Sequence, residues 1–290
     1  MSLPWKFDTL GVMGGLAPIS GTRGVFLTSA GVDVSSAMVV SGGTIGTGYN
    51  ADAALVLRRG RSVSQTIAAG GCMIVSSGGV SFNALTISGG SILVFRGGSA
   101  FGFAGNGTLR VSAGGVAISG VISASFISNF GEVANFTITY GGINVNAGTM
   151  HDCITSRATV TVYSALVADH IMRGGTMALK QGASITSGVV VSDGVLNVSS
   201  GIASDTTVSS GASAVVSSGG IASHFTSVDG ATVQVLSGGS ATTNGTAYGV
   251  SVAEGGALTV ESGGLALNVT AENPADVVVI DGGTVYPPLT

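Results

Sequence analysis

The chain has 290 residues, of which 49 are Gly and 5 are Pro; charged residues make up only 8% of it and apolar residues 45%. Each Gly costs about 1 kcal/mol inside a helix, so this composition excludes a helical bundle, and the apolar content excludes charge-driven disorder. All ten Lys and Arg lie in residues 1–180 with six acids, a net charge of +4, whereas residues 181–290 carry eight acids and a net charge of −8.

Residues 1–30 predict an N-terminal cap. They include Pro4, Trp5 and Phe7, and they contain no uninterrupted apolar core of the kind found in secretory signals. A helix needs about 18 or more consecutive apolar residues to span a bilayer. Every stretch of that length in the chain is interrupted by repeated Gly, Ser or charge. We therefore expect no membrane insertion by a helix of this chain.

Residues 31–270 predict a stack of repeated coils. Gly89 follows Gly70 by 19 positions, Gly238 follows Gly219 by the same interval, and the clearest units span 68–86, 87–108, 172–190 and 208–227. Each unit reads as short apolar alternations joined by Gly-rich corners, too short to fold unless copies stack. The sequence thus predicts an all-β, single-stranded parallel β-helix, or β-solenoid, with about 19 residues per repeat, as one domain over 1–290.

Three interior segments and the C-terminal end depart from the regular pattern. Asn-Gly pairs in 106–108 and 244–248 predict loops that bulge from the stack. Residues 147–171 lack a Gly pair and form the most irregular interior segment. Residues 271–290 predict a C-terminal cap, a last coil that ends at Pro287 and Pro288.

The corner sequences resemble a known family. VSSGG (75–79), VVSSGGIAS (215–223) and VAEGGALTVESGGLALNVT (252–270) are similar to the passenger repeats of AIDA-type, self-associating autotransporter adhesins. The match is best over 68–115 and 172–285. The resemblance implies a right-handed parallel β-helix at the surface of a Gram-negative bacterium, with self-association or binding to a host-surface or glycan receptor, and glycosylation of Ser or Thr. The family's signal peptide and translocator are expected to lie outside this chain.

Two groups of residues are candidates for surface contacts. Arg58, Arg59 and Arg61 form the one basic cluster, which suits an anionic glycan or a solvated corner. His151 and His170 are separated by one predicted repeat, so they are expected to stack on one face, while Asp152 and Asp169 do not share a register. This pattern is weak evidence for a metal or acid/base site, and we expect no catalytic residue, metal or cofactor.

Aromatic and sulfur-containing residues give two further expectations. Six Phe between positions 95 and 136 predict stacked core aromatics or an exposed sugar-binding platform: Phe95, Phe101, Phe103, Phe126, Phe130 and Phe136. Cys72 and Cys153 are about four coils apart, roughly 20 Å along the stack, so we expect both to be unpaired.

These observations favour a non-enzymatic, adhesin-like structural module. One alternative is a β-helix that binds or cleaves polysaccharide, as phage fibres and lyases do. The other is a self-assembling filament subunit, suggested by the opposite charges of residues 1–180 and 181–290. The chain has only ten basic residues, and this low number argues against nucleic-acid binding.

Overall fold

The computed structural model describes residues 25–28, 33–35, 38–40, 44–45, 54–58, 61–64, 66–67, 72–76, 78–87 and 89–287. The chain forms two compact units, Met1–Phe136 and Thr137–Thr290, which we describe separately. Most of the expected N-terminal cap lies outside the described residues.

Short strands make up the described part of both units. The strands that begin in the first unit are β1 (Val25–Thr28), β2 (Asp33–Ser35), β3 (Met38–Val40), β4 (Thr44–Ile45), β5 (Ala54–Arg58), β6 (Arg61–Val63), β7 (Thr66–Ile67), β8 (Cys72–Ser76), β9 (Val80–Phe82), β10 (Leu85–Thr86), β11 (Ser91–Val94), β12 (Ser99–Gly105), β13 (Thr108–Val111), β14 (Val116–Asn129) and β15 (Glu132–Asn146).

The second unit continues from the end of β15. Its further elements are β16 (Thr149–His151), β17 (Ile154–Tyr163), β18 (Leu166–Ala168), β19 (Ile171–Lys180), β20 (Ser184–Thr186), β21 (Val189–Ser199), β22 (Ile202–Ser204), β23 (Thr207–Val208), β24 (Ser213–Ser217), β25 (Ile221–Ser223), β26 (Thr226–Ser227), β27 (Thr232–Val235), β28 (Ser240–Thr243), β29 (Thr246–Tyr248), β30 (Val250–Val252), β31 (Ala257–Val260), β32 (Leu265–Leu267), β33 (Thr270–Ala271), the 3₁₀ helix η1 (Pro274–Asp276), β34 (Val277–Val279) and β35 (Thr284–Tyr286).

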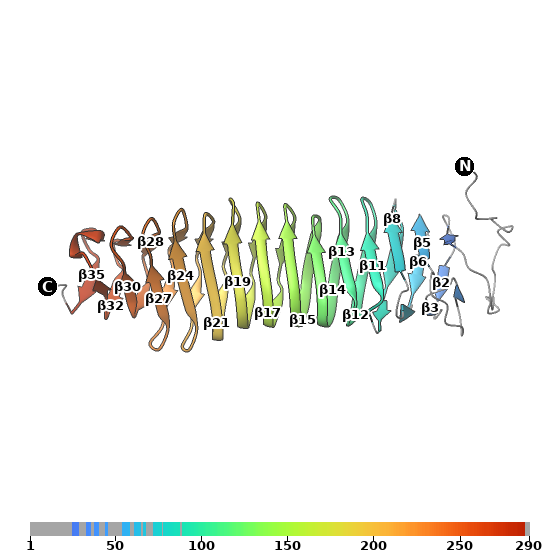
Figure 1. The fold of residues 1–290 in the computed structure, drawn as a ribbon, viewed down its shortest axis with the longest axis horizontal. Coiled ribbons are helices and arrows are strands. Elements are labelled where there is room, and N and C mark those ends of the chain that lie inside the picture. Colours follow the sequence, from blue (N-terminus) through green and yellow to red (C-terminus); the bar gives the residue numbers. More distant parts are fainter. Residues whose placement is uncertain are drawn as a thin grey trace. The chain divides into compact units, whose positions relative to one another are not determined.

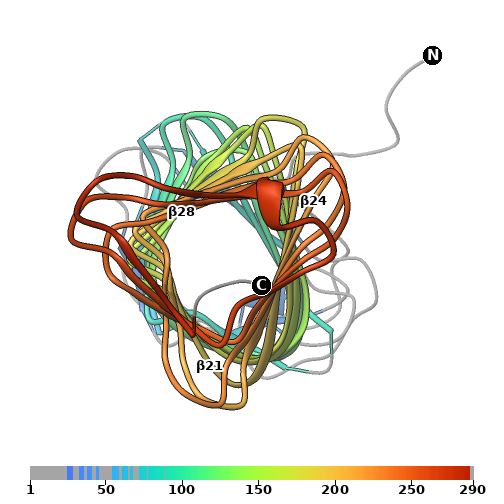
Figure 2. The same ribbon diagram turned by 90° about the vertical axis from the view of Figure 1, so that its left-hand side faces the viewer.

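The strands stack in parallel, which confirms the predicted β-solenoid. In the second unit, β17, β19 and β21 lie side by side (Figure 1). The pairing of β17 with β19 stays in register, whereas that of β19 with β21 shifts by one residue between Arg173 and Gly175. Seen end-on, the coils of this unit trace about three sides (Figure 2). Among the described strands, β3 and β4 form an antiparallel pair, with Val39 opposite Ile45.

The coil length varies around the predicted value of about 19 residues. Ser81 pairs with Ala100, 19 positions later, but Val160 pairs with Met177 after 17 positions and Val198 with Val216 after 18. One or two residues are therefore gained or lost per coil at the corners, because the parallel ladders between them stay in register.

Stacked apolar side chains fill the interior of each unit. One buried row in the first unit contains Met73, Ile92, Leu109 and Ile127. A buried row in the second unit contains Ile143, Val160, Met177, Leu196, Ala214, Val233 and Val250. Full burial stabilises the fold by about 1.5–3 kcal/mol for each large aliphatic side chain, so these rows and the continuous ladders hold the coils together.

The Gly-Gly corners behave as the sequence predicts. Gly78 and Gly97 have φ of 82° and 75°, and each donates its N–H to the matching Gly carbonyl of the next coil, at 2.6 and 2.8 Å. Gly occupies this left-handed conformation without a steric penalty. Repeated Gly at the corners therefore lets successive coils hydrogen-bond at each turn of the chain.

The segment expected to be irregular, 147–171, is regular instead. It holds β16, β17 and β18 in parallel pairs, and Met150 lies beside Val167 of the next coil. Ala147 and Ser164 adopt positive φ, at 56° and 44°, where other coils have Gly. The missing Gly pairs thus mark a change of corner residues and not a break in the stack.

Neither expected bulge is present. Thr108 begins β13 and pairs with Ser91, which makes this coil shorter than the predicted repeat. The N–H of Gly107 is held by Thr86 Oγ1 at 3.0 Å. The second Asn-Gly pair leads directly into β29, which pairs with β32. Both Asn-Gly pairs are therefore tight corners between paired strands.

The last described coil contains η1, and β34 and β35 pair in parallel with β31 and β32. Asn273 caps η1, its side-chain oxygen accepting the N–H of Ala275 at 3.1 Å. In the described part of the chain, no helix has the length and apolarity required to cross a membrane.

Candidate functional site

The predicted arginine cluster spans the end of β5 and the start of β6. Arg58 is the last residue of β5 and Arg61 is the first of β6, while Arg59 lies outside the described residues. Arg61 pairs in register with Val80 of the next coil. The backbone thus places Arg58 and Arg61 at the facing ends of two consecutive strands, and their role as a surface contact stays a prediction.

The two predicted histidines do not share a register position. His151 pairs with Ala168, and the same local spacing places His170 in line with Cys153, whose carbonyl accepts the N–H of Ile171. The two carboxylates share a register instead. Asp152 and Asp169 both sit at corners with positive φ, 53° and 48°. The repeat length assumed for this segment was therefore too long by two residues.

The two histidines also differ in environment. His151 is partly exposed, and its Nδ1 lies 2.8 Å from Asp152 Oδ2. His170 is only 1% exposed, so its ring is not offered to the surface. Its Nε2 lies 2.9 Å from Thr155 Oγ1, its Nδ1 has no hydrogen-bond partner, and burial lowers its pKa to about 4. His170 is therefore a neutral side chain of the interior.

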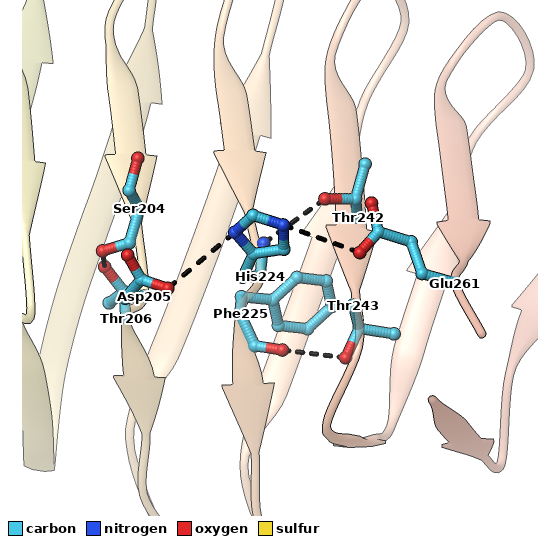
Figure 3. Close-up of polar contacts among 8 residues, drawn as sticks. All are labelled: Ser204, Asp205, Thr206, His224, Phe225, Thr242, Thr243 and Glu261. Atoms are coloured by element: carbon cyan, nitrogen blue, oxygen red, sulfur yellow. Dashed lines mark hydrogen bonds and ion pairs between the residues drawn. The ribbon is translucent and has the colours of Figure 1, made fainter. Parts of the chain in front are cut away.

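The third histidine stands on the surface between two carboxylates. His224 Nδ1 lies 3.7 Å from Asp205 Oδ1, and Nε2 lies 3.5 Å from a Glu261 carboxylate oxygen (Figure 3). The backbone N–H of His224 donates a hydrogen bond to Thr242 Oγ1 at 3.2 Å. Among the described residues, no three His, Cys, Asp or Glu are grouped closely enough to hold a metal ion.

Two exposed cations of the second unit lie over tyrosine rings of the preceding coil. Arg157 lies 5.9 Å from the centre of the Tyr140 ring and donates a hydrogen bond to its hydroxyl at 2.9 Å. Lys180 lies 5.8 Å from the centre of the Tyr163 ring. Such contacts contribute about 0.5–1 kcal/mol at exposed sites, and they hold the two cations at the surface.

The prediction of stacked core phenylalanines holds for only two of the six. Phe103 and Phe136 are buried with ring centres 6.5 Å apart. Phe101 is half-buried and stacks on Phe82. The remaining three are exposed by 41 to 46%: Phe95, Phe126 and Phe130. The interpretation of all six as core residues was therefore wrong for these three and for Phe101.

Phe95 and Phe130 line an open cavity of about 300 Å³ in the first unit. Strand pairing aligns Val94, Val111 and Asn129, and the next residue of each coil is Phe95, Ser112 and Phe130. We call this feature the phenylalanine slot. It is lined by Leu93, Phe95, Arg110, Val111, Ser112, Ala113, Ser128 and Phe130.

The polar side of the phenylalanine slot comes from the adjacent outward row. Leu93, Arg110 and Ser128 pair in register, two residues before the aromatic row. Arg110 is exposed, and its guanidinium forms no hydrogen bond or ion pair with any described residue. The slot thus combines apolar walls with an uncompensated positive charge and two hydroxyl groups.

The alternation of the strands could have revealed that Phe95 leaves the core. In β11 the inward residues are Ile92 and Val94, so Leu93 and the following Phe95 point outward. The prediction of core phenylalanines rested on residue type and not on strand position. Alternation in the flanking strands indicates which of them leave the core.

The comparisons with known proteins support the fold. Neither the protein-family models nor the curated proteins give a match to this chain. Among solved structures, the chain is similar to the crystal structure of a TibA fragment described as hyper-glycosylated in a TibC-catalysed reaction. The TM-score is 0.57 and the sequence identity 25%, over 90% of this chain and 93% of that one. The similarity supports an adhesin-like β-helix.

Proposed function

We propose that the chain is a non-enzymatic surface module of a Gram-negative bacterium, whose β-solenoid mediates self-association or adhesion. The similarity to the TibA fragment, over nine-tenths of both chains, carries this proposal. The V-x-S-G-G corners point the same way, since they resemble self-associating adhesins. Both observations point to a β-solenoid that presents regular rows of outward side chains.

Charge distribution supports self-association of the chain. Five Lys and Arg of the described side chains are exposed, at 96, 110, 157, 173 and 180. Asp193, Asp205, Asp229 and Glu254 are exposed in the acidic part, residues 181–290, which has no Lys or Arg. Attraction between the basic part of one copy and the acidic part of another then favours association that weakens with salt.

Ser and Thr of the outward rows are available for covalent sugars. The TibA fragment is named as hyper-glycosylated, and β24 of this chain has Ser213 and Ser217 on partly exposed positions. Glycosylation of Ser and Thr is therefore part of the proposal. Mass spectrometry of the chain isolated from its host tests it, because each hexose or heptose adds a defined mass.

Light scattering at several protein and salt concentrations tests the self-association. We expect the average mass to rise with protein concentration at low salt and to fall on addition of salt. The triple variant Arg157→Gln, Arg173→Gln and Lys180→Gln should associate less than the parent chain. The matched control Arg157→Lys, Arg173→Lys and Lys180→Arg keeps the charges and should associate as the parent does. A monomer at every concentration and salt would contradict self-association.

A further inference from the structure

The phenylalanine slot is created by the alternation of large and small residues along one outward row. Neighbouring strands are about 4.8 Å apart, so the backbones of Phe95 and Phe130, two coils apart, are separated by about 10 Å. Ser112 lies between them and fills little of that space. A ligand ring can therefore enter beside either phenylalanine without displacing a protein side chain.

The two phenylalanines have no aromatic partner in the described structure. The described ring contacts pair Phe82 with Phe101 and Phe103 with Phe136. Phe95 and Phe130 are instead exposed by 41% and 46%. Two apolar rings left in water next to a cavity favour a ligand that covers them, because covering apolar surface contributes about 25 cal/mol per Å².

Arg110 indicates that the ligand of the phenylalanine slot carries a negative charge. Its pairing places it between Leu93 and Ser128, and it is the one charged residue among those that line the slot. No described carboxylate neutralises it. A planar guanidinium binds a carboxylate through two parallel hydrogen bonds, which are stronger than hydrogen bonds between neutral groups.

We propose that the phenylalanine slot binds an acidic pyranose, a sugar ring that carries a carboxylate, within a surface polysaccharide. The apolar C–H face of the sugar would lie on Phe95 or Phe130, whose ring faces carry partial negative charge. The carboxylate would bind Arg110, and the sugar hydroxyls would bind the hydroxyls of Ser112 and Ser128. This inference deepens the proposed adhesive function. It rests on that function, because the chain would meet a polysaccharide as a module of the cell surface.

The lining favours a sugar over an aromatic acid or a second copy of the chain. The cavity, about 300 Å³, is at the lower end of the range for small-ligand sites. Ser112 and Ser128 supply polar partners that a purely aromatic acid does not use. The Asp and Glu side chains in residues 181–290 of another copy could pair with Arg110, but they have no rigid apolar face that would cover the phenylalanines.

Isothermal titration calorimetry with the full chain tests the proposal. The probes are an oligogalacturonate, the same oligosaccharide with its carboxylates reduced to alcohols, and phenylacetate. We expect the chain to bind the oligogalacturonate and to bind neither its reduced form nor phenylacetate. Arg110→Gln should weaken it by about tenfold or more, as expected for one charge-assisted bidentate contact. Phe95→Ala and Phe130→Ala should each weaken it about three- to tenfold.

The chain supplies matched controls. Phe126 is exposed by 44% but does not line the slot, and Arg96 is an exposed arginine outside it. Phe126→Ala and Arg96→Gln should bind the oligogalacturonate as the parent chain does. Circular dichroism melting establishes whether each variant is folded. If an alanine variant is unfolded, Phe95→Leu or Phe130→Leu replaces it, because leucine retains apolar contact.

Each contrary outcome would overturn the proposal. These are no binding of the oligogalacturonate, equal binding of its reduced form, stronger binding of phenylacetate, or equal weakening in the control variants. Self-association measured by light scattering is independent of the titration. A failure of sugar binding with intact association would therefore reject the slot while leaving the proposed function in place.

Discussion

His170 Nε2 lies 2.9 Å from Thr155 Oγ1 in the interior of the second unit, while the other ring nitrogen, Nδ1, is buried without a hydrogen-bond partner. This arrangement suits a neutral imidazole, because protonation would place an unpaired charge in the interior. The sequence spacing suggested His170 for a surface site, but the residue affects the stability of the fold instead.

Stability should fall as the pH is lowered because of His170. Burial lowers its pKa from 6.5 to about 4. Between these values the unfolded chain binds a proton that the folded chain does not, so the free energy of unfolding decreases as pH falls, by up to about 3 kcal/mol. Urea unfolding of the parent chain at pH 7.5, 5.5 and 4.5 measures this loss.

The variant His170→Gln isolates this effect. Its amide can hydrogen-bond Thr155 and does not titrate, so its free energy of unfolding should depend less on pH between 6.5 and 4 than that of the parent. Carboxylates contribute equally to both chains and cancel in the comparison. Equal losses in parent and variant over this range would show that His170 is not responsible.

Two glycines with similar positive φ should respond differently to substitution. Gly175 and Gly182 have φ of 82° and 75°. A Cβ on Gly175 would collide with the backbone of Ala158, whereas a Cβ on Gly182 meets nothing within 4 Å. Gly182→Ala should cost about 1 kcal/mol, the backbone term alone, and Gly175→Ala at least about 2 kcal/mol more. Melting temperatures of the two variants measure the difference, and equal losses would contradict it.

The regular features of the fold could be predicted from the sequence. Gly pairs such as Gly78-Gly79 indicate corners because Gly readily accepts positive φ. Corners at Ala147, Ser164, Asp152 and Asp169 could not be recognised in this way. Ala, Ser and Asp have other uses at most positions, so their presence does not by itself indicate a left-handed residue. The predicted repeat of about 19 residues was two residues too long in this segment, where Val160 pairs with Met177.

The candidate site could be predicted only in part. The phenylalanines were recognised as a cluster, and a sugar platform was one interpretation of it, but the slot depends on register. Ser112 follows Phe95 by 17 positions, and Phe130 follows Ser112 by 18. The constant repeat assumed from the sequence is longer than either interval and does not align the three residues, so the cavity between them follows only from the strand pairing.

Cys72 and Cys153 form no disulfide with each other, as predicted, and should react at different rates. Cys153 is buried, and its Sγ donates to the carbonyl of His151 at 3.2 Å. Cys72 is partly exposed, and burial of its thiol raises its pKa, which lowers the thiolate fraction at neutral pH. We expect slow labelling of Cys72, slower labelling of Cys153, and rapid labelling of both in denaturant. The variants Cys72→Ser and Cys153→Ala assign the two rates. Faster labelling of Cys153 than of Cys72 in the folded chain would contradict the buried position.

Adjacent residues at one corner give the sharpest contrast between surface and core. His224 is exposed between Asp205 and Glu261, and exposed ion pairs contribute about 0–1 kcal/mol. Phe225 is buried beside it, and its carbonyl accepts the Thr243 hydroxyl at 2.8 Å (Figure 3). Phe225→Ala should therefore cost about 3–5 kcal/mol, and His224→Ala less than about 1 kcal/mol. Denaturant unfolding at pH 7.5 measures both. A large loss in His224→Ala would mean that the surface contacts of His224 hold the corner in place, since that substitution leaves the buried ring of Phe225 and the hydroxyl contact of Thr243 unchanged.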